Sequence, residues 1–230
     1  MGDDCRFKIP EECRKFGDTS EECLIEKRQV AEEFIQKFTK QVAPPKYLDC
    51  SNKAWTQSVR RRFIEICPEG CYALPSDPLT RKGEHLVDYT WAEVENGKRV
   101  LLASESEWGS DKYGKPHWYR VEEDFEKLLS VKAPFKVLIF SSNCKVGESL
   151  GSVEGDFSIG FAKRMLETSL GNYGHHIPGE VYIFIDFPQT GVADSPGIFR
   201  SFIWLADQYG KAKVELRKAG HGDLIRPTSS

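Results

Sequence analysis

The sequence predicts an α/β (α+β) protein in which a mixed central β-sheet is flanked by helices. Three observations lead to this fold class. Apolar residues recur at helical spacing near the N-terminus, two strand-like segments flank the hairpin signal Asn96-Gly97, and two short runs further on are almost wholly apolar. Such runs are typical of strands that are covered on both faces, so we expect helices on both sides of the sheet.

The composition is that of a globular protein with a nearly balanced charge. Of the 230 residues, 40% are hydrophobic and 29% are charged, which is enough apolar material for a sizeable core. The formal net charge of −3 excludes a generally basic nucleic-acid coat, but it leaves room for a local basic track beside an acidic site. Because no secretory signal and no long apolar run are visible, we expect a cytoplasmic protein without membrane contact.

Seven cysteines, an odd number, occur without a CxxC pair. In a cytoplasmic chain, reduced and mostly buried thiols are the expectation. A zinc site formed by Cys67 and Cys71 with His85, or with His175 and His176, is the alternative.

Two helices are predicted before the hairpin. The first covers residues 20–42, because its apolar residues recur at helical spacing, Ser20 can serve as the N-cap and Pro44-Pro45 ends it. The second covers residues 52–67 and is followed by a loop that contains several prolines. Its apolar stripe consists of Trp55, Val59, Phe63 and Ile66.

The remaining elements alternate between strands and helices. The patterns predict strands over residues 86–94, 99–108, 135–140 and 181–187, helices over 119–131 and 155–170, and a closing hairpin of 198–205 with 213–216.

These elements suggest one core domain with additions at both ends. We assign residues 1–45 to an N-terminal helical arm, residues 46–218 to the core domain, and residues 219–230 to a flexible polar tail.

Three acidic residues on the 86–108 hairpin form the main candidate site. Strand side chains alternate between faces, so Glu105 and Glu107 share one face with Leu101 and Ala103. Pairing about Asn96-Gly97 places Asp88 directly across from Glu105, with β-carbons about 5 Å apart. Facing like charges destabilise a sheet unless something compensates them, and Mg²⁺ or Mn²⁺ would do so. A solvated acidic face, or pairing with lysines, is the alternative.

With this arrangement, the sequence resembles the PD-(D/E)xK nuclease superfamily, which has the restriction-endonuclease-like fold. The core of that family is a helix, a strand meander, a helix and a further strand, with an Asp on the second strand and (D/E)-x-K on the third. Asp88 corresponds to the Asp, and Glu105-Ser106-Glu107 corresponds to the third-strand motif with Glu in place of Lys. The resemblance covers residues 52–142.

The departure from the motif directs attention to two further residues. The resemblance implies that Lys127, on the following helix, could supply the missing ammonium, whereas an i,i+4 ion pair with Glu123 is the alternative. Relatives often carry a further acid on the first core helix, and Glu65 is the candidate, although it could equally be solvated.

The resemblance implies metal-dependent hydrolysis of a phosphodiester bond in DNA. Asp88 and Glu105 would hold Mg²⁺ or Mn²⁺, and Glu107 would be a further ligand or a base that orients the attacking water. Basic residues around the core would position the DNA backbone without reading its sequence. The candidates are Arg60, Arg61, Arg62, which fall largely away from the apolar stripe of their helix, and Arg81 and Lys82.

A second interpretation is a catalytically inactive module of the same fold that binds or scaffolds in a DNA-related or defence complex. The absent lysine and the negative net charge favour it. Either a homodimer or a complex with a partner protein is compatible with both interpretations. No P-loop, GxGxxG or GxSxG motif occurs, so nucleotide-binding and hydrolase-elbow functions lack support.

Overall fold

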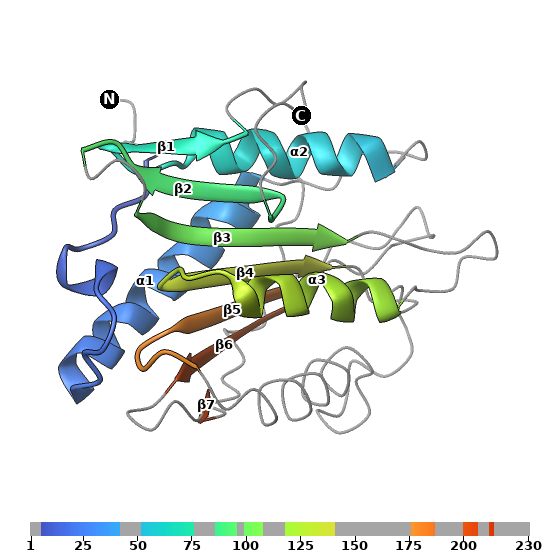
Figure 1. The fold of residues 1–230 in the computed structure, drawn as a ribbon. Helices are drawn as coiled ribbons and strands as arrows, with labels where there is room; N and C mark the ends of the chain where they lie inside the picture. The colour runs from blue at the N-terminus through green and yellow to red at the C-terminus, as the bar shows by residue number, and fades with distance from the viewer. Residues whose placement is uncertain are drawn as a thin grey trace.

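A mixed β-sheet with helices on both faces forms the protein (Figure 1). The three α-helices of the described residues are α1 (Glu21–Gln41), α2 (Asn52–Glu65) and α3 (Trp118–Ser130), and a short 3₁₀ turn, η1 (Glu12–Arg14), precedes α1. The computed structural model describes residues 6–41, 52–75, 86–95, 99–107, 118–140, 176–186, 200–206 and 212–213.

The strands lie side by side in the order in which they occur in the chain. They are β1 (Cys71–Leu74), β2 (Tyr89–Glu93), β3 (Val100–Glu107), β4 (Phe135–Phe140), β5 (Val181–Asp186), β6 (Arg200–Ala206) and β7 (Ala212–Lys213). The first three form an antiparallel meander, β3, β4 and β5 run parallel, and β6 and β7 are again antiparallel to their neighbours.

Alternation along the central strands separates two hydrophobic layers. On β4, Phe135, Val137 and Ile139 pack with α1 and α2, whereas Leu138 and Phe140 pack with α3. All six residues of β4 are buried, which accounts for its nearly continuous apolar sequence. In Figure 1, α3 lies in front of the sheet and α1 passes behind it.

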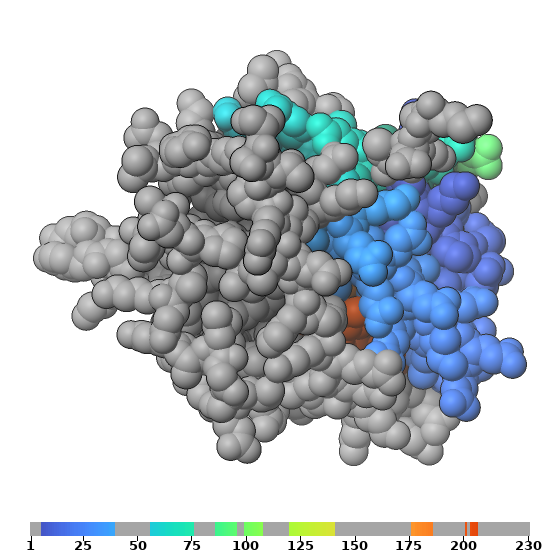
Figure 2. Space-filling view, turned by 180° about the vertical axis from the view of Figure 1, so that it is seen from behind, coloured from blue at the N-terminus to red at the C-terminus, as the bar shows by residue number. Residues whose placement is uncertain are grey.

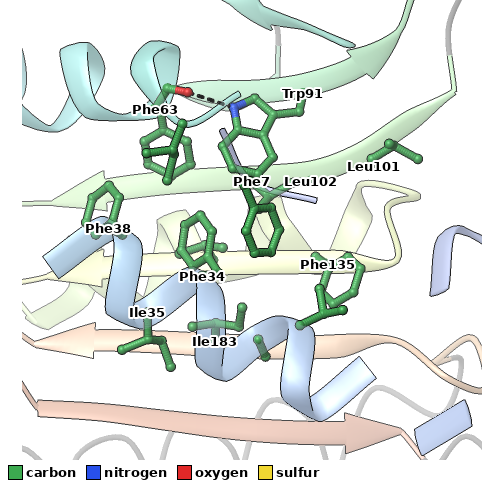
Figure 3. Close-up of a cluster of buried hydrophobic side chains, with 14 of the residues drawn as sticks. Phe7, Phe34, Ile35, Phe38, Phe63, Trp91, Leu101, Leu102, Phe135 and Ile183 are labelled. Atoms are coloured by element: carbon green, nitrogen blue, oxygen red, sulfur yellow. Dashed lines mark hydrogen bonds between the residues drawn. The ribbon is translucent and has the colours of Figure 1, made fainter. Parts of the chain in front are cut away.

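Helix α1 is an integral layer of this core. Phe34 is 1% exposed, and its ring centroid lies between 5.5 and 5.9 Å from those of Phe7, Phe38, Phe63 and Trp91 (Figure 3). The outer side of the helix forms part of the surface in Figure 2. A division at residue 45 therefore does not separate this helix from the core, since its apolar stripe is buried against the sheet.

One strand of the meander is absent from the sequence-based prediction. Residues 71–74 form β1, which pairs with β2, where a loop was expected. A four-residue strand at a sheet edge carries little alternation to detect, and only Ala73 of β1 is buried. This strand makes β2 the second and β3 the third strand of the meander.

The predicted hairpin register holds at one end and shifts at the other. Tyr89 pairs with Ser104 as expected, but a bulge between Trp91 and Ala92 displaces the register toward the turn. As a result, Leu101 packs in the layer of α1 and α2, and the prediction that it shares a face with Ala103 is wrong. The Asn96-Gly97 turn, the predicted helix over 155–170 and the predicted tail lie outside the described residues.

A buried polar network lies where β4 and β5 begin. Lys136 Nζ is 2.8 Å from Glu180 Oε1, and both side chains are 2% exposed. Tyr182 donates its hydroxyl proton to Glu180 Oε2, so its oxygen accepts a proton held on Nδ1 of His176, 2.8 Å away. Burial lowers the pKa of Lys136, and the facing Glu180 carboxylate opposes that shift.

Replacing Phe34 tests whether α1 belongs to the core. We expect F34A to lower the free energy of unfolding by about 3–5 kcal/mol, because the substitution leaves a cavity among four aromatic rings. Urea denaturation measures the change. I25A, at a position that is 49% exposed on the same helix, should change stability by no more than about 0.5 kcal/mol. Equal effects of the two substitutions would contradict an integral α1.

Removing the charge of Glu180 tests the buried network. E180Q leaves the Lys136 ammonium buried without its counter-charge, and such a loss costs about 3–5 kcal/mol. E32Q breaks the more exposed ion pair between Arg28 and Glu32 and is expected to cost no more than about 1 kcal/mol. Thermal unfolding of both variants separates the two cases, and an E180Q protein as stable as E32Q would show that the network contributes nothing.

Candidate functional site

The structure brings Asp88 and Glu105 together at the edge of the β2–β3 pairing. Asp88 immediately precedes β2, and the pair next to it, Tyr89 with Ser104, fixes Asp88 and Glu105 as cross-strand neighbours. In this arrangement, the negative charge of Asp88 contributes to the raised pKa of Glu105. Glu105 is 3% exposed, because β3 is covered by α3 on this face and lies between β2 and β4.

Backbone and side-chain donors hold Asp88 in place. Its Oδ2 atom accepts a hydrogen bond of 2.9 Å from the amide of Ser106 and one of 3.1 Å from the hydroxyl of the same residue. Two donors to one oxygen satisfy a negative charge at this atom. The two hydrogen bonds therefore fix the orientation of the Asp88 carboxyl group.

Glu105 is the partner that retains a proton. Burial raises the pKa of Glu105 to about 10, and the negative charges of Asp88 and Asp124 act in the same direction against the opposing charge of Lys127. At neutral pH, a protonated Glu105 can donate its hydrogen bond to Asp88, which removes the repulsion between the two groups. The pair thus forms an acid and a carboxylate with different roles.

Helix α3 adds two charged residues to this pair, one of which the sequence analysis missed. Asp124 is 8% exposed, and its Oδ1 lies 2.6 Å from Nζ of Lys127. Lys127 therefore forms its ion pair with Asp124, three residues earlier on the helix. The partner that the sequence analysis considered, Glu123, is exposed. The hydrogen bond to Asp124 raises the pKa of Lys127, which keeps the ammonium charged.

A sequence signal for Asp124 does exist. It stands within the apolar face of α3, directly before Phe125, and Val121 and Leu128 lie one turn to either side. An acidic residue on a face that packs against a sheet requires a compensating partner. Burial raises the pKa of Asp124, and the hydrogen bond and charge of Lys127 oppose the shift.

The other two predicted acidic residues, Glu107 and Glu65, lie on different elements, β3 and α2. Glu107 is half-buried at the end of β3, two residues beyond Glu105 and opposite Phe140 of β4. Glu65 is exposed on α2 and forms an ion pair of 3.3 Å with Arg62. Since α2 packs on the other face of the sheet from α3, the structure does not bring Glu65 to the Asp88–Glu105 pair.

The arginines of α2 are placed differently from the prediction. Arg60 and Arg62 are 7% and 4% exposed, so the inference that they point away from the buried side of the helix is wrong for both. Arg62 donates to the backbone oxygen of Lys37 and so ties α2 to the end of α1. Arg61 is exposed. The two remaining basic candidates, Arg81 and Lys82, lie outside the described residues.

The described cysteines are free thiols. Cys13 and Cys23 are buried and Cys67 and Cys71 are half-buried, and burial raises the pKa of Cys67 to about 12. Among the described residues, no three His, Cys, Asp or Glu side chains are grouped so that they could hold a metal ion together. None of the helices in this part of the chain is long and apolar enough to cross a membrane.

Comparisons with known proteins give no relative. No family model matches the chain, and neither a curated protein nor a solved structure matches it significantly.

The raised pKa of Glu105 makes stability depend on pH. Between its ordinary pKa of 4.5 and about 10, the folded state holds a proton that the unfolded state has lost. The free energy of unfolding should therefore fall as pH rises through this range, by up to about 1.4 kcal/mol per pH unit. E105Q removes this contribution, so we expect it to be more stable than the wild type at pH 8, with the difference vanishing toward pH 4.

Urea denaturation between pH 4 and pH 9 with EDTA present measures this difference. E126Q, which neutralises an exposed glutamate on α3, serves as the matched control and should follow the wild-type curve. If the curves of E105Q and the wild type run parallel, Glu105 does not retain its proton in the folded state.

Proposed function

We propose that this protein is a metal-dependent nuclease that hydrolyses phosphodiester bonds in DNA, with a restriction-endonuclease-like core. The observation that supports it most is the cross-strand placement of Asp88, which immediately precedes β2, beside Glu105 on β3, since the PD-(D/E)xK pattern has an Asp on the second strand and an acid on the third. The order α2, β1 to β3, α3 and β4 also agrees with the helix, meander, helix and strand of that family.

The donor atoms at the pair suit a hard cation. Asp88 and Glu105 offer carboxylate oxygens, the ligands that Mg²⁺ and Mn²⁺ prefer, and Glu107 is the third acid on the same strand. A bound cation would polarise the phosphate and lower the pKa of its water. Glu105 would bind as the carboxylate, giving up its proton, and Glu107 would orient the attacking water or add a ligand.

Lys127 takes the place of the motif lysine in this proposal. Its ammonium is held by the 2.6 Å ion pair with Asp124, it interacts electrostatically with Glu105, and its side chain is 41% exposed. A fixed positive charge at this position stabilises negative charge that develops on phosphoryl oxygens. Arg61 is the described α2 arginine whose exposure suits contact with a DNA backbone.

A second candidate function is a catalytically inactive binding module of the same fold. The tight pairing of Lys127 with Asp124 favours it, because an ammonium neutralised by its own helix is less available to a substrate. Burial of Arg60 and Arg62 also reduces the basic surface that α2 could offer to a nucleic acid.

Cleavage assays separate these functions. The full chain is incubated with labelled single- and double-stranded DNA and RNA in the presence of Mg²⁺, Mn²⁺ or EDTA. A nuclease should cleave only with metal, and E105Q should lose about 100-fold or more of that activity, because it removes a charged ligand without changing side-chain shape. E126Q should cleave as the wild type does.

Two outcomes of the cleavage assay would contradict the nuclease proposal. Metal-independent cleavage, or cleavage that E105Q retains, would exclude this site as the catalytic centre. Salt-sensitive DNA binding without cleavage under any metal would support the inactive module instead.

A further inference from the structure

Ser106, the central residue of the Glu105-Ser106-Glu107 segment, contacts the proposed site from the other side of the sheet. Strand alternation directs its side chain away from those of the two glutamates. Nevertheless, its amide and its hydroxyl both donate to Oδ2 of Asp88, at 2.9 and 3.1 Å. This is possible because Asp88 lies just before β2, beyond the first residue pair of the hairpin.

Tyr89 stands directly behind Ser106. Its hydroxyl lies 3.4 Å from Ser106 Oγ and 3.5 Å from the backbone oxygen of Thr56 on α2. The phenol ring is 2% exposed and stacks on Phe63 at a centroid distance of 4.9 Å with an interplanar angle of 8°. The guanidinium of Arg60 lies 6.0 Å from the centre of the same ring. Packing therefore holds this hydroxyl in position.

The number of available protons determines which group donates to Asp88. A serine hydroxyl has one proton, and an ionised carboxylate can only accept, so the Ser106 proton is directed to Asp88. The lone pairs of Ser106 Oγ are then the groups that face Tyr89, which has one proton to donate. The hydrogen bonds to Asp88 therefore come from Ser106, whereas the single proton of Tyr89 has two acceptors within reach, Ser106 Oγ and the backbone oxygen of Thr56.

We propose that Ser106, supported by Tyr89, is a positioning residue that fixes the Asp88 carboxylate for metal binding. This inference rests on the proposed function, since it assigns a task within the same site. According to this proposal, the variable middle position of the Glu-x-Glu segment requires a residue with a hydroxyl group. It also links the site to α2 on the opposite face of the sheet, through the buried phenol of Tyr89.

The chain contains a matched control for this proposal. Ser104 lies two residues before Ser106 on the same strand and the same face, and it is 0% exposed. In the described part of the structure, its Oγ atom has no hydrogen-bond partner. S104A therefore removes a buried serine hydroxyl from β3 without touching Asp88.

Titration of the full chain with Mn²⁺ alone, followed by the electron paramagnetic resonance signal of the free ion, measures the effect. Loss of an outer partner of a metal ligand typically weakens binding about 10- to 100-fold, and we expect S106A to fall in this range. S106T retains a hydroxyl and should recover most of the affinity, whereas S104A should bind as the wild type does. Y89F should show a smaller loss, because Ser106 keeps its own proton.

Two results would overturn the inference: S106A that binds Mn²⁺ as tightly as the wild type, or S104A that weakens binding equally. Unchanged affinity in Y89F would remove Tyr89 from the proposal. Thermal unfolding of each variant verifies that the proteins compared are folded.

Crystal structures of the wild type and S106A separate this inference from the proposed function. If the wild type binds no Mn²⁺ and cleaves no DNA, the nuclease proposal fails. The purpose of metal binding then fails with it, and the two structures decide only whether Ser106 positions Asp88: a displaced carboxylate in S106A supports this positioning, and an unchanged carboxylate overturns it.

Discussion

Burial of the central strands on both faces is the constraint on which the rest of the structure depends. Each residue of β4 must face one of two apolar layers, so alternate side chains contact α1 and α2 or contact α3. A polar side chain on these strands cannot reach water unless it lies near a strand end. Of the acidic residues of β3, Glu107 at the strand end is half-buried, whereas Glu105, two residues before it, is 3% exposed.

The same constraint determines the chemistry of the Asp88–Glu105 pair. A carboxyl group that is covered by a helix and faces a second carboxyl cannot remain charged without cost. The protein responds in two ways: Glu105 keeps a proton, and Asp124 with Lys127 brings a compensating cation to the same region. Because Glu105 keeps a proton that the unfolded chain loses, the pair lowers the free energy of unfolding at neutral pH relative to pH 4.

Large parts of this arrangement follow from local patterns. The bounds of α1, α2, α3, β4 and β5 agree with the periodicity of the sequence to within a few residues. The juxtaposition of Asp88 and Glu105 follows from the hairpin register, because cross-strand pairing beside a short turn is a local property. Other features depend on contacts between segments far apart in the chain. The bulge that reorients Leu101, the edge strand β1 and the burial of Arg62 against the end of α1 are of this kind.

The sequence by itself determined the three described α-helices, the strands other than β1, the two-sided burial of the central strands and the cross-strand placement of two acids, since these depend on periodicity and on neighbours along the chain. Only the tertiary structure decided that α1 is a layer of the core, that Asp124 joins the acids and that Glu65 lies on the opposite face. The reason is physical: a helix side can be recognised from its spacing, but which sheet face it covers depends on the packing of the whole domain.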